Sequence, residues 1–388
     1  MRFLHTSDWH VGKVLKGQDR LAEQQAVLGE LVRIAGEQQV DAVLVAGDLY
    51  ETVTPSAPAQ QLVVRTLLAL RDTGAEVVAI AGNHDHAPTL DAYRPLADAA
   101  GITLVGRVRR PDDGGLVSFT ARSDSSPVRV ATVPFLSQRY AVRAAELIAN
   151  TPAENSAGYD AWVRRIVGML ASGFAPDAVN VVLAHLTVTG AAVDGGGERQ
   201  SQSIFDYHVP AAAFPADAHY VALGHLHRRQ SVPAPCPVHY CGAPLRVDFG
   251  EVDSSPVVLV VDATPDTPAR VTEVPVTSAR RLRTLRGTLA ELAAQAAAVE
   301  PDDLVKVVVA EPARAGLRED VRELIPNAVE VHVTREAPAA REPEPARTDR
   351  APADLLRDYL RSRDVADPRV EALFARLHDA VLTGEART

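Results

Sequence analysis

Five short segments of this sequence place metal-binding side-chain types directly after an apolar run. In chain order the segments HTSDWH, AGDLYE, AGNHD, LAHL and LGHLH supply Asp8, His10, Asp48, Asn83, His84, His185, His225 and His227. Because each set follows a strand-like run, all can gather along one sheet edge, where open α/β sheets bind their ligands. One histidine after a strand is more often a hydrogen-bonded cap than a ligand. Five strand ends that all supply such types indicate a metal site.

The side-chain types indicate which metals would bind. Carboxylate and amide oxygens favour Mg or Mn, and imidazoles extend the range to Mn, Fe and Zn. Asp48 has two carboxylate oxygens, so it could bridge two ions roughly 3.5–4 Å apart, the spacing of two-metal hydrolases. Two divalent ions held by Asp8 and Asp48 keep a net positive charge, which attracts a phosphodiester. Such a centre can activate water near neutral pH and polarise a phosphoryl oxygen.

The elements that must position these residues alternate between strand and helix in the first hundred residues. Strand-like runs at 2–7, 40–47 and 76–82 are separated by helical patterns at 21–39 and 55–74. This order predicts a largely parallel sheet with helices packed on it. From Gly101 to Val276 further strands follow, with two helical stretches between Ser137 and Gly173. Two sheets packed face to face between helices would accommodate this mixture.

The remainder of the chain predicts a division into domains. Residues 1–277 form the first domain, and residues 278–338 read as a compact β-α-β-α-β block. Residues 339–352, rich in Pro, Ala and charge, are most simply a semi-extended linker. The tail, 353–388, contains two short amphipathic helices. Their apolar stripes are Leu355, Leu356, Tyr359 and Leu360 in the first, and Val370, Leu373, Phe374, Leu377 and Val381 in the second.

Composition limits the function classes without choosing one. The chain has 388 residues, of which 46% are hydrophobic and 23% charged, as in ordinary soluble globular proteins. The net charge of -10 argues against a generally basic nucleic-acid coat but does not exclude local contact with phosphates. No apolar run approaches the roughly 18 residues of a membrane span, and the N-terminus lacks a signal-peptide core. With only two cysteines, we expect a cytoplasmic protein that does not contact a membrane.

The order Asp-x-His, Gly-Asp, Gly-Asn-His-Asp, His, Gly-His-x-His resembles the signature of calcineurin-like metallophosphoesterases. Longer stretches, including LHTSDWHVGK, VDAVLVAGDLYE, YVALGHLHRRQ and HYCGAPLRVDFGE, resemble the nuclease subunits of bacterial complexes that pair a nuclease with an ATPase. The resemblance covers nearly the whole chain. It implies an α/β fold, a four-layer α/β/β/α sandwich, followed by a small α/β capping domain and a helical tail that binds the ATPase.

The resemblance also implies a role for each site residue. One metal would be held by Asp8, His10, Asp48 and His227, and the other by Asp48, Asn83, His185 and His225. His84 would lie beside the scissile phosphate, as a group that stabilises charge or protonates the leaving oxygen. Glu51 stands where bacterial members have Asp and archaeal members have His. We expect it to orient His84 and raise its pKa; the alternative is a solvated surface glutamate.

The activity implied is that of a two-metal DNA nuclease, with Mn²⁺ as the expected metal and Mg²⁺ as the other choice. It would be a 3′-to-5′ exonuclease on duplex ends and an endonuclease on single strands and hairpins, and the nuclease chain is expected as a dimer. Because the sequence has no phosphate-binding loop of the type Gly-x-x-x-x-Gly-Lys-Ser/Thr, ATP would be hydrolysed by the partner chain. Two alternatives remain open: a stand-alone esterase for small phosphodiesters, and a binding scaffold without catalysis.

Overall fold

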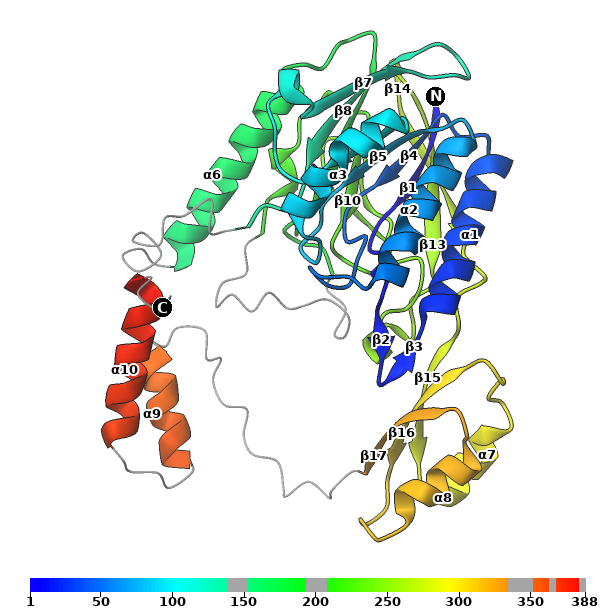
Figure 1. Ribbon diagram of the computed structural model, residues 1–388, viewed down its shortest axis with the longest axis vertical. Coiled ribbons are helices and arrows are strands. Elements are labelled where there is room, and N and C mark those ends of the chain that lie inside the picture. Colours follow the sequence, from blue (N-terminus) through cyan, green and yellow to red (C-terminus); the bar gives the residue numbers. More distant parts are fainter. Residues whose placement is uncertain (138–151, 193–207, 334–351, 363–367, 384–388) are drawn as a thin grey trace. The chain divides into compact units, whose positions relative to one another are not determined.

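The computed structural model describes residues 1–137, 152–192, 208–333, 352–362 and 368–383. The chain divides into two compact units (Figure 1). The first comprises Met1–Val142 and Asn150–Arg335, and the second comprises Arg143–Ala149 and Glu336–Thr388. No helix in the described ranges is long and apolar enough to cross a membrane.

Two six-stranded sheets form the centre of the first unit, in the orders β14-β13-β1-β4-β5-β6 and β11-β12-β10-β9-β8-β7. In the first sheet β1, β4, β5 and β6 are parallel, and β13 is antiparallel to both β1 and β14. Its strands are β1 (Arg2–Thr6), β4 (Ala42–Val45), β5 (Glu76–Ile80), β6 (Ile102–Val105), β13 (Val257–Thr264) and β14 (Thr267–Pro275). In the second sheet β8, β9, β10 and β12 are parallel, and β7 and β11 are the antiparallel edge strands. Its strands are β7 (Leu116–Thr120), β8 (Pro127–Val133), β9 (Val179–His185), β10 (Tyr220–Gly224), β11 (Gln230–Val232) and β12 (Val238–Tyr240).

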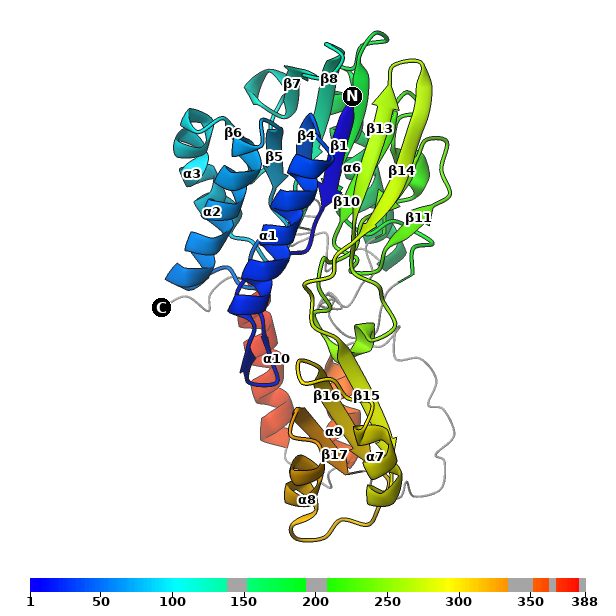
Figure 2. The same cartoon turned by 90° about the vertical axis from the view of Figure 1, so that its right-hand side faces the viewer.

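The two sheets pack face to face because their central strands are apolar on both faces. Phe3, Leu44 and Ile80 of the first sheet share one buried cluster with Leu183 and Tyr220 of the second. Helices cover the outer faces, as Figures 1 and 2 show. The first sheet is covered by α1 (Leu21–Glu37), α2 (Ala57–Asp72) and α3 (Ala87–Ala99), and the second by α6 (Pro152–Ala171). The expected four-layer α/β/β/α sandwich is therefore confirmed.

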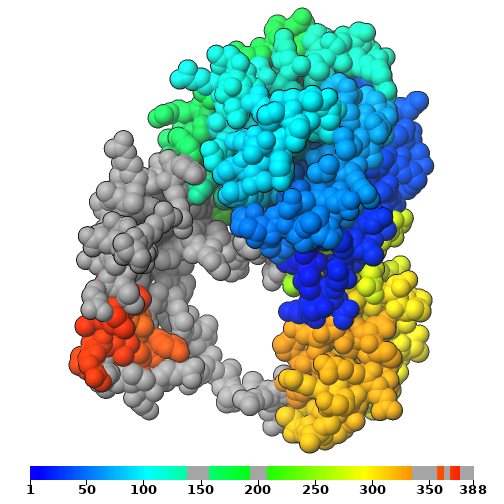
Figure 3. Space-filling model, viewed as in Figure 1, coloured from blue at the N-terminus to red at the C-terminus, as the bar shows by residue number. Residues whose placement is uncertain are grey.

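Two helical features differ from the sequence expectation. Helix α3 was not anticipated, since Pro95 inside it weakens the helical pattern. Together with α2 it forms much of the face turned to the viewer in Figure 3 (blue to cyan). Between Ser137 and Gly173 the described residues contain one helix, α6; the other expected helical stretch falls within 138–151, outside the described residues.

A smaller domain closes the first unit with the expected β-α-β-α-β order. Its elements are β15 (Leu282–Gly287), α7 (Leu289–Ala296), β16 (Leu304–Val309), α8 (Leu317–Leu324) and β17 (Ala328–Val333). The three strands are parallel, and Leu292, Val305 and Val307 belong to the domain's own apolar core. The capping box of Thr288 and Glu291 fixes the start of α7.

The smaller domain contacts helix α1, where Glu23 accepts the Arg280 amide at 2.9 Å, and it packs near three short elements of the larger domain. These are the hairpin β2 (Val14–Leu15) and β3 (Gln18–Asp19), and the 3₁₀ helix η3 (Phe249–Glu251). Leu15 and Phe249 share a buried cluster with Leu282 and Leu304 of the smaller domain. Two further 3₁₀ turns, η1 (Pro111–Asp113) and η2 (Ala211–Ala213), lie in loops of the second sheet.

The second unit contains the two helices that the tail pattern predicted, α9 (Pro352–Ser362) and α10 (Pro368–Thr383). Arg357 Nε lies 3.3 Å from Glu371 Oε2, so the helices contact each other. Tyr359 is 57% exposed and Leu373 is 45% exposed. The predicted linker, 339–352, lies outside the described residues except for Pro352, which begins α9.

Candidate metal centre

The candidate site lies where β1, β4 and β5 of the first sheet and β9 and β10 of the second come to an end. Beyond β1 and β4 the two chain segments continue side by side. The Asp8 amide donates to Gly47 O (3.0 Å), and the His10 amide donates to Asp48 O (3.0 Å). The last residue of β9, His185, pairs in register with Gly224 of β10, which places it next to His225. All seven expected ligands and His84 are thereby brought to one edge.

The backbone at four of these positions adopts the left-handed conformation that side chains rarely take. The φ angles are 54° at Asp8, 45° at His10, 53° at Asp48 and 100° at His225. Such conformations cost of order 1–3 kcal/mol each and persist where surrounding contacts impose them. Gly82 makes room for the turn after β4, since a Cβ there would lie 2.1 Å from Asp48 Oδ1.

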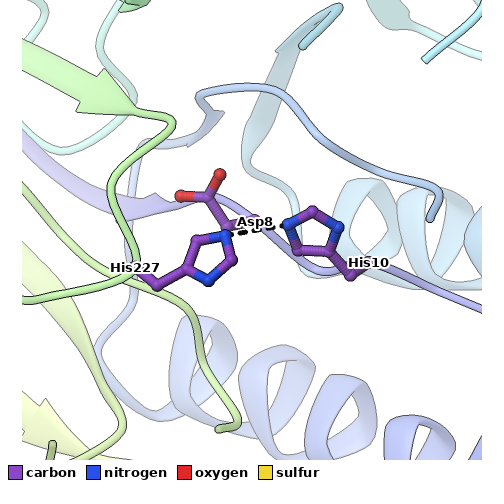
Figure 4. Close-up of side chains that lie close together, drawn as sticks. All are labelled: Asp8, His10 and His227. Atoms are coloured by element: carbon purple, nitrogen blue, oxygen red, sulfur yellow. Dashed lines mark hydrogen bonds between the residues drawn. The ribbon is translucent and has the colours of Figure 1, made fainter. Parts of the chain in front are cut away.

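Asp8, His10 and His227 form one group of ligand atoms, all within 4.8 Å of one another (Figure 4). His10 Nδ1 lies 3.0 Å from Glu51 Oε2, and His227 Nδ1 lies 2.8 Å from Glu251 Oε1. Burial lowers the pKa of His10 to about 3, so its ring is neutral, and its Nδ1 carries the proton donated to Glu51. The Nε2 atoms of His10 and His227 then face each other at 3.1 Å. Two ring nitrogens this close to each other suit a shared proton or a shared metal ion.

His185, His225 and Asn83 form a second group. His185 Nδ1 donates to Ala46 O (2.7 Å), which leaves a lone pair on Nε2, because burial lowers the pKa of His185 well below its usual value. That Nε2 faces Asn83 Oδ1 at 2.9 Å. The same Asn83 oxygen lies 2.9 Å from His225 Nδ1. Lone pairs of His185 and Asn83 therefore converge with no proton of these two groups between them, and this donor set also fits a divalent ion.

Asp48 lies between the two groups. Its Oδ2 is 3.7 Å from His10 Nε2 and 3.5 Å from His185 Nε2, while its Oδ1 accepts the His84 amide at 2.8 Å. Burial, followed by repulsion from Asp85, raises the pKa of the Asp48 carboxyl well above its usual value. Asp8 is as deeply buried, and burial raises the pKa of its carboxyl also. Buried carboxylates need cations or hydrogen bonds to remain charged, and nearby metal ions would supply the charge.

The Glu51 carboxylate lies within ion-pair distance of His84, but its own hydrogen bonds go to other residues. His84 Nδ1 is held by the main-chain carbonyl of Glu51 at 2.8 Å, and the Glu51 carboxylate lies 3.7 Å away. The longer glutamate reaches past His84 to His10 Nδ1 and to Lys13 Nζ, the latter at 2.9 Å. Burial raises the pKa of Glu51, but the hydrogen bonds from His10 and Lys13 outweigh it and lower the pKa to about 2. Glu51 is thus a half-buried, ionised partner of His10, a candidate ligand, and its side chain is only 16% exposed.

Sequence reasoning missed two carboxylates that hold the site together. Asp85 accepts the amides of Gly82 (2.8 Å), Tyr50 (3.0 Å) and Leu49 (3.2 Å), and so joins the loops after β4 and β5. Glu251 holds His227 and also accepts the Val247 amide at 2.7 Å. Both stood in the quoted stretches, GNHD and VDFGE, but only their burial distinguishes them from turn or surface residues.

The chain matches two family models and is similar in sequence to several curated bacterial proteins. The family model of calcineurin-like phosphoesterases matches residues 1–229, and that of the type 5 capsule protein repressor C-terminal domain matches residues 278–364. The chain is 38% identical over 297 residues to the SbcD chain of the nuclease SbcCD of Bacillus subtilis, covering 73% of this chain and 71% of the relative. The corresponding Escherichia coli K12 protein is 31% identical over 311 residues, covering 76% and 73%. The Rhodobacter capsulatus protein is 34% identical over 271 residues, covering 68% and 66%.

Proposed function

Because this chain belongs to the SbcD family of nucleases, within the calcineurin-like phosphoesterases, we propose that it cleaves DNA at the cluster of Asp, His and Asn side chains. The chain is a metal-dependent hydrolase of the nuclease class. The observation that carries the proposal is the convergence of ring nitrogens and an amide oxygen, between His10 and His227 and between His185 and Asn83, in a donor set that suits divalent cations.

The residues would hold two divalent ions, with Mn²⁺ proposed as the native metal. One would be held by Asp8, His10, Asp48 and His227, and the other by Asp48, Asn83, His185 and His225. Bound there, the ions would supply Lewis acidity to the phosphodiester and lower the pKa of a water molecule.

His84 would act on the leaving group. Its Nδ1 bonds to the Glu51 carbonyl, which can only accept, so Nδ1 carries a proton and Nε2 is the nitrogen that gains or loses one. The ring lies edge-on to His10, with centroids 4.6 Å apart, and therefore at the border of the metal cluster. A protonated His84 would donate from Nε2 to the departing sugar oxygen.

We propose the ATPase SbcC as the partner, with the helical tail as its tether. The relatives are named as components of the nuclease SbcCD. In this chain α9 and α10 belong to a unit of their own, and α10 carries exposed apolar side chains, Val370 and Leu373. Helix pairs of this kind dock into apolar grooves of a partner.

A dimer of this chain would complete a heterotetramer-type complex with SbcC. Helices α2 and α3 expose Val64 (45%), Leu68 (40%) and Leu96 (73%) on one face of the first unit. The face contains an apolar cavity of about 350 Å³. Exposed apolar patches of this kind mark interaction sites, and a second copy would cover it symmetrically. Cys236 and Cys241 are both free thiols, which suits the reducing cytoplasm as the place of action.

The test compares substrates and partners in one experiment. Full-length protein, alone and with SbcC, is incubated in Mn²⁺ or Mg²⁺ with end-labelled duplex DNA, hairpin DNA and bis(p-nitrophenyl) phosphate. We expect 3′-to-5′ degradation of duplex ends and cleavage of hairpins, both stimulated by SbcC and ATP. Hydrolysis of the chromogenic ester without cleavage of any DNA would instead support a small-phosphodiester esterase. Inactivity on all three substrates would support a scaffold.

A further inference from the structure

The two groups of candidate ligands differ in the acceptor that binds the imidazole nitrogen on the side of the ring away from the site. In the first group, His10 and His227 each place Nδ1 against a carboxylate, that of Glu51 and that of Glu251. In the second group, His185 places Nδ1 against a main-chain carbonyl, Ala46 O. A carboxylate acceptor makes the opposite ring nitrogen a more basic metal ligand than a carbonyl does, and loss of such a partner typically weakens metal binding about 10–100-fold.

Glu251 is suited to this role by its own fixation. The residue is 2% exposed, and both carboxylate oxygens are engaged, Oε1 with His227 Nδ1 at 2.8 Å and Oε2 with the Val247 amide at 2.7 Å. The side chain therefore has one available position, and so does the His227 ring. The 3₁₀ helix η3 that carries Glu251 is itself fixed at its start, because the Asp248 side chain caps the Gly250 amide.

The same 3₁₀ helix contacts the smaller domain. Phe249, two residues before Glu251, is 6% exposed and packs in one cluster with Leu282 and Leu304 of that domain. The other carboxylate of the pair has a parallel connection. Glu51 is bonded to Lys13, which directly precedes the β2 hairpin, and Leu15 of that hairpin belongs to the same cluster. Both carboxylates behind the first group thus lie next to segments against which the smaller domain packs.

We propose that Glu251 is a positioning residue that makes the Asp8, His10 and His227 site the tighter of the two metal sites, and that it makes this affinity depend on the docking of the smaller domain. This inference rests on the proposed function, because it takes two metal ions as given. Its consequence is ordered loading: the first site fills at low Mn²⁺, and the second fills when the concentration rises. Displacement of the smaller domain would loosen the first site before the second.

The test is a titration of chelator-treated full-length protein with Mn²⁺. Binding is measured by calorimetry and, independently, by the electron paramagnetic resonance signal of free Mn²⁺. We expect the wild type to bind in a tight and a weak step. Glu251→Gln keeps the size of the side chain but removes its charge and one acceptor, and should weaken the tight step about 10–100-fold while the weak step stays unchanged. Phe249→Leu, which loosens the contact with Leu282, should weaken the same step to a smaller extent. Asp253→Asn is the matched control: it removes a charge two residues away on an exposed side chain, and both steps should match the wild type.

Two further readouts separate positioning from mere stabilisation. The melting temperature of Glu251→Gln in chelator should stay near that of the wild type, and raising Mn²⁺ should restore its nuclease rate. Wild-type affinities at both steps in Glu251→Gln would overturn the inference, and so would an equal loss at both. Failure of the wild type to bind Mn²⁺ would overturn the proposed function as well, so the two failures are distinguishable.

Discussion

His84 provides the sharpest test of the chemistry, because its two roles in the fold can be separated. Its main-chain amide donates to Asp48 Oδ1 at 2.8 Å and so supports the candidate bridging carboxylate. Its side chain makes a different contact, from Nδ1 to the Glu51 carbonyl. Replacement of the side chain leaves the amide in place. We therefore expect His84→Gln to keep its metal while losing the proton donor.

The magnitude depends on the leaving group. The sugar oxygen of DNA is a poor leaving group that benefits from protonation, and general acid assistance is typically worth about 10²–10⁴-fold. That range corresponds to about 2.7–5.4 kcal/mol of barrier. p-Nitrophenolate departs readily without a proton, so the variant should lose less than about tenfold on bis(p-nitrophenyl) phosphate.

The assay measures single-turnover rates on hairpin DNA and on the chromogenic ester at saturating Mn²⁺, with metal content by atomic emission. His86→Gln is the matched control, since His86 is an exposed imidazole two residues away whose Nδ1 contacts Thr89 Oγ1. Equal losses on both substrates with metal retained would refute leaving-group protonation. Loss of metal in proportion to rate would make His84 a ligand.

The other predictions concern the bridging carboxylate, the loop brace and the tail. Asp48→Asn should abolish DNA cleavage and weaken both Mn²⁺ binding steps in calorimetry, because Asp48 Oδ2 lies close to both His10 and His185. Near-normal cleavage by this variant would contradict the assignment of Asp48 as a ligand. Asp85→Ala should lower the free energy of unfolding, measured in urea with chelator present, by about 3 kcal/mol, because three buried amides lose their acceptor at about 1–3 kcal/mol each. Removal of a carboxyl whose pKa burial raises to about 6 offsets part of this loss. A loss below about 1 kcal/mol would contradict the bracing role. A chain ending at Arg341 should keep basal Mn²⁺-dependent cleavage but no longer co-elute with SbcC, and unchanged co-elution would exclude the tail as the main tether.

The sandwich architecture could be predicted from the sequence because polar residues mark the ends of its apolar strands. Apolar runs that end in Gly47-Asp48 or in His225 are strands buried on both faces, and such strands require layers on both sides. Helix α3 escaped prediction because Pro95 lies inside it, where a proline removes a backbone hydrogen bond and normally kinks or ends a helix, yet the helix continues to Ala99. Hydrophobic periodicity therefore predicts the buried faces of regular helices and strands well, but it predicts poorly a helix that contains a proline.

The side-chain partners inside the site could not be predicted, for a geometric reason. Periodicity fixes which strand end a residue occupies but not how far its side chain reaches. One methylene decides that Glu51 passes His84 and contacts His10, while the carbonyl of Glu51 takes the place we expected for its carboxylate. Likewise, nothing in the VDFGE stretch indicates that Glu251 returns to His227, 24 positions earlier, because that contact depends on the fold of the intervening loop.

The strained backbone and the buried acids of the site have a common explanation. Asp8, His10 and Asp48 adopt left-handed backbone conformations, and the carboxyls of Asp8 and Asp48 are buried with raised pKa values. Each feature costs free energy unless something compensates for it. Their effect is geometric: the carboxylates that follow two neighbouring strands, β1 and β4, lie close to imidazoles of the other sheet. Cations bound there would relieve the repulsion, so the fold stores in its metal-free state part of the free energy that metal binding releases. We therefore expect the two carboxylates to bind a divalent ion more tightly than exposed carboxylates would.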